Sequence, residues 1–223
     1  MNQTLPIVEQ FHSIQGEGFH AGSSAYFVRL ASCNIGCTWC DTKYSWSSKG
    51  FPDISIDLLA EEIIEAKGKG AGFVVITGGE PLHHNLNNLC KLIKAKSIDK
   101  GECSLPIHLE TSGVDKLTGI LDWITLSPKI HKPPTEELLG SCNEIKVVIN
   151  KWEDIRFAEN IANHSIDIRK KNAKITGTTF QDLKLYLQPA WGNNQGKELS
   201  IEFVKNNPLW KLSLQTHKMI DIQ

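Results

Sequence analysis

The sequence predicts an α/β fold, built as a partial, open barrel of about six or seven mostly parallel strands. Short apolar segments alternate with helical segments along the chain, and this alternation is typical of βαβ units with parallel strands. Nearly every glycine-rich or polar motif follows directly after a predicted strand. In an α/β barrel such positions share one face, the C-terminal mouth, and a closed barrel needs eight strands. We therefore expect an incomplete barrel with its site at that mouth.

Each predicted strand is an apolar run that ends in a polar or turn-forming motif. We expect strands at residues 25–30, 73–77, 107–110, 123–126, 144–149, 183–187 and 211–214. Helices are expected at 57–67, 86–96, 117–121, 152–162 and 199–205. The first of them carries its apolar residues at helical spacing and ends before Gly68. The glycine-rich segment 11–18 is interpreted as a loop. No repeat or linker divides the chain, so we expect a single domain over residues 1–223.

The charge and hydropathy of the chain exclude several classes of protein. Lys and Arg total 24 against 25 Asp and Glu, so no basic field points to nucleic acid or a membrane surface. The apolar runs are far too short to span a bilayer, and the first residues lack the apolar region of a signal peptide. Six cysteines without a secretion signal are then expected to be thiols in a reducing compartment. We expect a cytoplasmic protein with no nucleic-acid or membrane partner.

Three cysteines, Cys33, Cys37 and Cys40, lie within eight residues. Thiolates packed this closely can converge on one metal centre. A structural zinc site needs four protein ligands, and no fourth Cys or His follows at finger or ribbon spacing. A [4Fe-4S] cluster held by three cysteines would keep one iron open to a small molecule. A disulfide cluster or a small zinc site is the alternative. The remaining cysteines, at positions 90, 103 and 142, are interpreted as packing or surface thiols.

The Cys-x3-Cys-x2-Cys spacing, with Trp39 before the last Cys, resembles the signature of radical S-adenosylmethionine (SAM) enzymes. Further motifs narrow the resemblance to the 7-carboxy-7-deazaguanine synthase family. They are Ser-Ile-Gln-Gly-Glu-Gly at 13–18, Arg-Leu at 29–30, Cys-Asp-Thr-Lys at 40–43, Val-Ile-Thr-Gly-Gly-Glu-Pro at 75–81, Glu-Thr-Ser-Gly at 110–113, Ser-Pro-Lys at 127–129, Leu-Gln-Pro at 187–189 and Gln-Thr-His-Lys at 215–218. They occur in the family's order, whereas residues 44–72 and 130–180 match no motif.

This resemblance implies an enzyme that contracts the ring of 6-carboxy-5,6,7,8-tetrahydropterin to 7-carboxy-7-deazaguanine, with loss of ammonia. The product supplies queuosine-type nucleosides. The implied cofactors are a [4Fe-4S] cluster, SAM and Mg2+. The reduced cluster would cleave SAM to a radical that removes a hydrogen from the pterin, and SAM would be re-formed. No catalytic side chain is expected, because the cofactor carries the chemistry. An electron donor such as a flavodoxin-type reductant and a homodimer are also expected.

The site residues follow from the same resemblance. The cluster ligands would be the three cysteines of the segment 33–40. Contacts to SAM are expected from Trp39, Cys40, Asp41, Gly79, Ser127, Pro128, Lys129 and Gln188. Contacts to the substrate are expected from Ile14, Gln15, Gly16, Arg29, Thr77 and the terminal carboxylate at Gln223. Arg29 would clamp the substrate carboxylate, which a guanidinium matches bidentately.

Thr42 is expected to bind Mg2+, because its hydroxyl is a hard oxygen donor of the kind that this ion prefers. The alternative is a threonine that caps or closes the cysteine loop. Two other functions stay open for the chain as a whole. One is a different radical SAM enzyme, such as a glycyl-radical activase, and the other is a non-catalytic zinc-binding module.

Overall fold

The computed structural model describes residues 3–99, 104–177 and 182–223. Within these ranges nine strands form one sheet in the order β3-β1-β2-β4-β5-β6-β7-β8-β9. The strands are β1 Thr4–Ile14, β2 Ser24–Leu30, β3 Asp53–Ser55, β4 Phe73–Gly78, β5 Ile107–Thr111, β6 Trp123–Leu126, β7 Glu144–Ile149, β8 Lys184–Pro189 and β9 Trp210–Leu212. From β2 to β9 each strand pairs in parallel with the next, and β1 and β3 are added antiparallel at one edge. The predicted open, mostly parallel sheet is confirmed.

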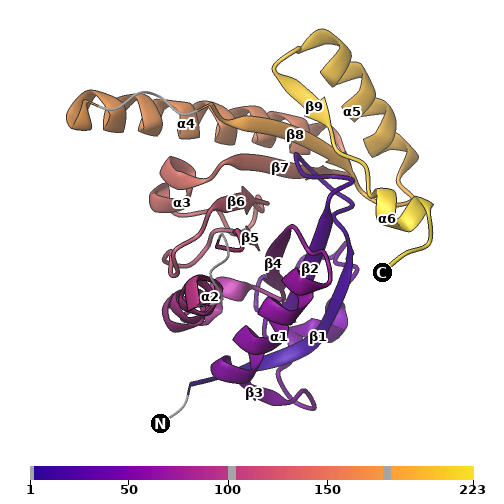
Figure 1. The fold of residues 1–223 in the computed structure, drawn as a ribbon. Helices are drawn as coiled ribbons and strands as arrows, with labels where there is room; N and C mark the ends of the chain where they lie inside the picture. The colour runs from indigo at the N-terminus through magenta and orange to yellow at the C-terminus, as the bar shows by residue number, and fades with distance from the viewer. Residues whose placement is uncertain (1–2, 100–103, 178–181) are drawn as a thin grey trace.

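The helices lie along the outer side of this curved sheet (Figure 1). They are α1 Ile56–Gly68, α2 Asn87–Asp99, α3 Glu136–Ser141, α4 Trp152–Thr176, α5 Asn194–Asn206 and α6 Thr216–Met219, with short 3-10 helices η1 Lys43–Trp46 and η2 Pro81–His83. None of the helices in the described ranges combines the length and apolar character that crossing a lipid bilayer requires.

The two faces of each central strand carry different chemistry, because successive side chains point to opposite sides. In β7 the residues Ile145, Val147 and Ile149 belong to the apolar core that the helices cover. Their neighbours Lys146 and Val148 line a pocket on the other side. The helix-facing side therefore stabilises the fold by burying apolar surface, and the inner side is free to carry polar groups.

Several segments differ from the sequence-based expectation, and the short elements β3, α3 and α6 were not predicted. Residues 4–14 form the long strand β1, which was missed because Pro6 and several polar residues interrupt its alternation. The helix expected at 117–121 is absent, since Gly119 has a φ of +94°, outside the helical region. Helix α4 continues to Thr176, well beyond residue 162, because buried side chains as far as Arg169 keep its face against α3 and β7.

The open side of the barrel is filled by the β1–β2 loop and by the C-terminal segment 213–223, which lie side by side (Figure 1). Ser213 Oγ accepts a hydrogen bond from Gly18 N at 3.0 Å. Thr216 N donates to Gly16 O at 3.0 Å. These bonds join residues about 200 positions apart in the sequence. The C-terminal segment 213–223 therefore forms part of the wall on the open side of the barrel.

Two helical glycines give a matched test of packing. A Cβ on Gly196 in α5 would lie 2.1 Å from the carbonyl oxygen of Ile149, whereas a Cβ on Gly68 in α1 would meet nothing within 4 Å. We expect Gly196→Ala to lower the free energy of unfolding by about 1–3 kcal/mol, as overpacking does. Gly68→Ala should leave stability equal or raise it by up to about 1 kcal/mol. Urea unfolding followed by circular dichroism measures both, and equal midpoints would contradict the close contact of α5 with β7.

Candidate active site

One large pocket of about 1110 Å³ opens at the carboxyl ends of the parallel strands. All three clustered cysteines line it. So do nearly all the other residues predicted from the sequence: Ile14, Gln15, Gly16, Arg29, Trp39, Asp41, Thr42, Thr77, Gly79, Ser127, Lys129, Gln188 and Gln223. Pro128 is the exception, because it is buried beside Ser127 and Lys129 without lining the pocket. The structure thus brings together residues from seven separate stretches of the chain.

The cysteine loop leaves the carboxyl end of β2 and is held by main-chain hydrogen bonds. Cys33 N donates to Trp46 O at 3.0 Å, and Cys40 N donates to Cys37 O at 3.2 Å. His131, which lies far away in the sequence, also contacts the loop. Its Nε2 lies 3.0 Å from the carbonyl oxygen of Ile35. These contacts hold the backbone of the loop that carries the three thiols.

The chemistry of this donor set fits an iron–sulfur cluster. All three thiols are free of disulfides. In the described part of the chain, no three His, Cys, Asp or Glu side chains are arranged to hold a single metal ion. In a [4Fe-4S] cluster each cysteine binds a different iron, so the thiols need not meet at one point. Burial raises the pKa of Cys33 and of Cys37, so ligation at neutral pH proceeds with loss of their protons.

Gly79 packs against the cysteine loop. A Cβ there would lie 2.3 Å from the carbonyl oxygen of Ser32 and 2.9 Å from Cβ of Cys33. The sequence predicts that this glycine contacts SAM. The structure gives a further reason for a glycine here, because the backbone directly after β4 lies close to the cysteine loop.

The next residue, Glu80, joins two of the sequence motifs and is only 1% exposed. Its carboxylate accepts hydrogen bonds from Thr111 Oγ1 at 2.5 Å, Ser112 N at 2.8 Å and Ser112 Oγ at 2.5 Å. The hydroxyls after β5 therefore hold the end of β4 in place. This cross-link keeps the pocket wall rigid behind the cysteine loop.

The residues predicted for SAM come from the cysteine loop and from the ends of β4, β6 and β8. Lys129 Nζ, after β6, donates to Ser127 Oγ at 2.7 Å. Gln188 in β8 accepts a hydrogen bond from Ser213 Oγ at 2.8 Å. Asp41, beside the last cysteine, forms an ion pair with Lys218 of α6 at 2.5 Å. The cluster side of the pocket is thereby connected to the C-terminal segment.

On the opposite side, Arg29 already has a partner within the chain. Its Nε lies 2.6 Å from Glu9 Oε1, and Glu9 Oε2 accepts from Gln223 Nε2 at 3.0 Å. Ser13 Oγ donates to the main-chain oxygen of Gln223 at 2.6 Å. The end of the chain folds back to the pocket, as the substrate prediction for Gln223 requires.

Thr42 also lines the pocket, and its hydroxyl lies 3.5 Å from Cys40 Sγ. It precedes η1 but makes no side-chain capping hydrogen bond. Thr42 therefore does not cap η1 through its side chain. Its carbonyl oxygen, not its hydroxyl, closes the turn by accepting from Ser45 N at 2.9 Å.

A group of charged residues that lines the pocket was not predicted from the sequence. We call this group the pocket floor; it consists of Lys146, Glu17 and Glu110. Lys146 of β7 forms an ion pair with Glu17 of the β1–β2 loop and a second one with Glu110 of β5 at 3.9 Å. Glu110 also accepts from Gln15 Nε2 at 3.1 Å and from Thr77 Oγ1 at 3.4 Å. A lysine between apolar residues, at an inward position of β7, is the signal that could have revealed this group.

The sequence matches the radical SAM superfamily over residues 28–130. The 7-carboxy-7-deazaguanine synthase of Prochlorococcus marinus is 50% identical, over 100% of both chains. That of Synechocystis sp. is 41% identical over 99% of this chain and 94% of the relative. The crystal structure of QueE from Escherichia coli superposes with a TM-score of 0.71 at 28% identity, covering 95% of this chain and 93% of that one. The chain therefore belongs to the 7-carboxy-7-deazaguanine synthase family, within the radical SAM superfamily.

Proposed function

We propose that this chain converts 6-carboxy-5,6,7,8-tetrahydropterin to 7-carboxy-7-deazaguanine with loss of ammonia, in a single domain over residues 1–223. The product would enter queuosine-type 7-deazapurines. The observation that carries the proposal is the gathering of the three thiols and the family's other motifs in one pocket. A full-length relative of that name at 50% identity supports it. Nothing comparable supports a glycyl-radical activase or a zinc module.

Membership of the radical SAM superfamily implies a [4Fe-4S] cluster and SAM. When bound, they supply a carbon radical that can remove a hydrogen atom from an unactivated position. The three cysteines of the loop would hold the cluster, leaving one iron for SAM. We assign the SAM contacts to the residues around that loop and at the ends of β4, β6 and β8: Trp39, Cys40, Asp41, Gly79, Ser127, Pro128, Lys129 and Gln188. The protein's part is to position SAM against the substrate and keep water away.

The substrate would lie on the side of the pocket formed by β1, β2 and the tail. Gln15 is 8% exposed and its amide is held by Glu110, so it can present a fixed hydrogen-bonding edge to the heterocycle. Ile14, Gly16, Thr77 and Gln223 line the same region. Arg29 is anchored to Glu9 through Nε, and a guanidinium has five N–H donors, so others stay available for the substrate carboxylate.

We assign a Mg2+ ion to Thr42, whose hydroxyl lines the pocket without capping the following turn. One neutral protein ligand gives weak binding alone, so the substrate's oxygens and water would complete the octahedron. There the ion would orient the substrate and polarise it.

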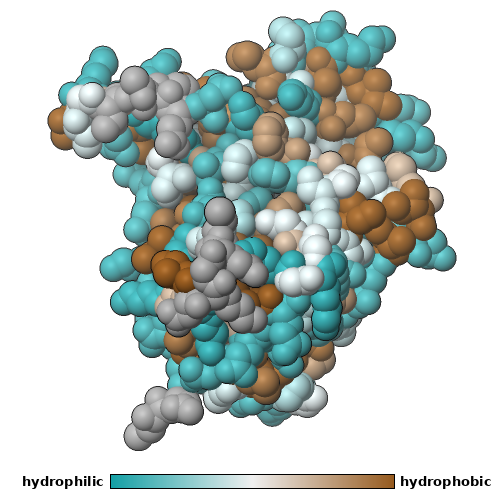
Figure 2. Space-filling model, in the orientation of Figure 1, coloured by the Kyte–Doolittle hydropathy of each residue, from teal (hydrophilic) through white to brown (hydrophobic). Residues whose placement is uncertain are grey.

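The expected partners follow from the surface. The balance of charges supports a cytoplasmic enzyme with no nucleic-acid or membrane partner. An electron donor such as a flavodoxin-type reductant is needed to reduce the cluster. A homodimer is supported by apolar side chains gathered on the C-terminal segment (Figure 2), where Met219 and Ile220 are 57% and 59% exposed.

The assay that tests the function uses anaerobic protein with reconstituted iron and sulfide, SAM, a reductant and the carboxytetrahydropterin. We expect 7-carboxy-7-deazaguanine and ammonia in equal amounts. Cys37→Ala should lose both iron and activity, because a thiolate ligand is gone. Cys90→Ala, a buried cysteine outside the pocket, is the matched control and should keep its iron. No product from wild-type protein with a full cluster would refute the function.

To test the carboxylate clamp, we expect Arg29→Lys to bind the substrate as weakly as Arg29→Ala does. An ammonium cannot keep the Glu9 contact and also bind a second carboxylate bidentately. Loss of such a charge-assisted contact weakens substrate binding by on the order of 2–5 kcal/mol. The exposed Arg156→Lys is the control. Substrate titration of the unreduced protein measures the effect, and unchanged affinity in Arg29→Ala would exclude the clamp.

For the metal, we expect Mg2+ to raise the wild-type rate and Thr42→Val to lose that response while keeping its cluster, because only the ligand oxygen is removed. Thr42→Ser retains the oxygen and should still respond. Rates measured with and without Mg2+ decide the assignment. Full stimulation of Thr42→Val would leave Thr42 as a residue of the loop alone.

A further inference from the structure

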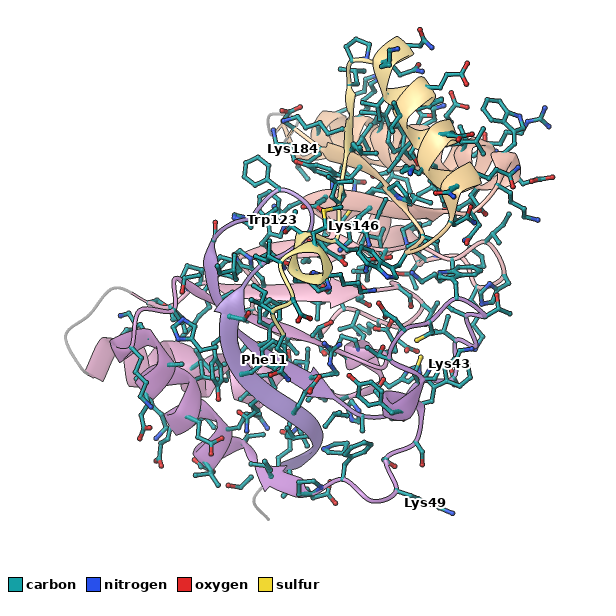
Figure 3. All side chains as sticks on the ribbon, turned by 90° about the vertical axis from the view of Figure 1, so that its right-hand side faces the viewer. Phe11, Lys43, Lys49, Trp123, Lys146 and Lys184 are labelled. Carbon is teal, nitrogen blue, oxygen red and sulfur yellow. The ribbon has the colours of Figure 1, made fainter. Side chains whose placement is uncertain are left out.

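Lys146 is an unusual residue for the inside of a barrel. It is 4% exposed and lies on the inner face of β7, near the middle of the molecule (Figure 3). Burying an ammonium is unfavourable unless charged partners surround it. Although burial acts against the charged form, the neighbouring carboxylates Glu110, Glu17 and Glu144 raise the pKa of Lys146 above its usual value. The lysine is therefore a fixed positive charge on the pocket floor.

The lysine faces charged groups on every element that packs against it. Glu17 comes from the β1–β2 loop, Glu110 from β5 and Glu144 from β7 itself. On the other sides, Lys129 after β6 and His217 of α6 are near enough to interact electrostatically. Glu144 lies below the pocket and burial raises its pKa to about 7, so it is partly neutral at neutral pH. The two carboxylates that line the pocket are Glu17 and Glu110.

These two carboxylates both form ion pairs with the ammonium of Lys146, and both line the pocket. Burial alone would raise the pKa of Glu17, but the charge and hydrogen bond of Lys146, with help from Gln215 and His217, hold it at about 2. Glu17 therefore stays ionised across the neutral range. A pair of carboxylates that lines a pocket favours a ligand that presents several N–H donors. The amino-pyrimidine edge of a pterin has that pattern.

We propose that Lys146 is a positioning residue for the substrate, which holds the carboxylates of Glu17 and Glu110 side by side so that they accept the N–H donors of the pterin ring. The inference rests on the proposed function and concerns how its substrate is read. Lys146 itself acts through the two glutamates.

The test is an anaerobic substrate titration of the protein with SAM and an unreduced cluster, so that no turnover occurs. We expect Lys146→Met to weaken pterin binding at least about tenfold, as loss of a charge-assisted hydrogen bond does, with SAM affinity unchanged. The ratio of variant to wild-type dissociation constants should grow as the pH falls. Without the lysine, burial raises the pKa of Glu17, and the protonated form can no longer accept both donors. Lys91→Met, at an exposed lysine outside the pocket, is the control.

A second variant separates positioning from stability. Lys146→Met/Glu17→Gln removes both charges, so its thermal stability should recover relative to Lys146→Met, yet pterin affinity should not. Recovery of affinity together with stability would overturn the proposal. So would wild-type affinity and no pH trend in Lys146→Met. If wild-type protein turns over the pterin in the same preparation, either result removes only the role of Lys146. Absence of wild-type turnover would remove the proposed function itself.

Discussion

An open barrel has to close around its interior with something other than a strand, and most of this site depends on how that closure is made. Here the β1–β2 loop and the C-terminal segment meet across the gap through the bonds of Gly18 with Ser213 and of Gly16 with Thr216. Both segments form part of the pocket wall. They therefore bring Gln15, Glu17 and Gln223 to the pocket. The contacts that close the fold therefore also place these residues in the pocket.

The outer and inner faces of the sheet contribute differently to stability and to ligand binding. Replacing a buried ion pair by apolar groups is often neutral or stabilising, so the group around Lys146 is not needed to hold the sheet together. The sheet is held by the apolar outer faces of its strands, such as Ile145 and Val147, against the helices. The charged inner face is therefore free to serve ligand binding. The Asp41–Lys218 pair extends the same arrangement, since it joins the cysteine loop to the C-terminal segment across the pocket.

Much of the site could be predicted because its residues occur in short motifs directly after strands, where parallel topology alone brings them together. Long-range pairing could not be. Strand β1 is defined by its pairing with β2 rather than by its own alternation, and Gly119 ends a helical pattern through a single positive φ. The buried lysine was missed for a related reason, because a charge in an apolar strand acquires meaning only from Glu17 and Glu110, which lie far away in the sequence.

The central claim is that one pocket holds the cluster, SAM and the pterin together. The most direct measurement is a crystal structure of the anaerobically reconstituted protein with SAM and the carboxytetrahydropterin, with iron located by anomalous scattering. The account predicts an iron cluster bound by Cys33, Cys37 and Cys40, with the pterin ring between Glu17 and Arg29 and its carboxylate on Arg29. Iron bound elsewhere, or a pterin lying outside this pocket, would contradict it.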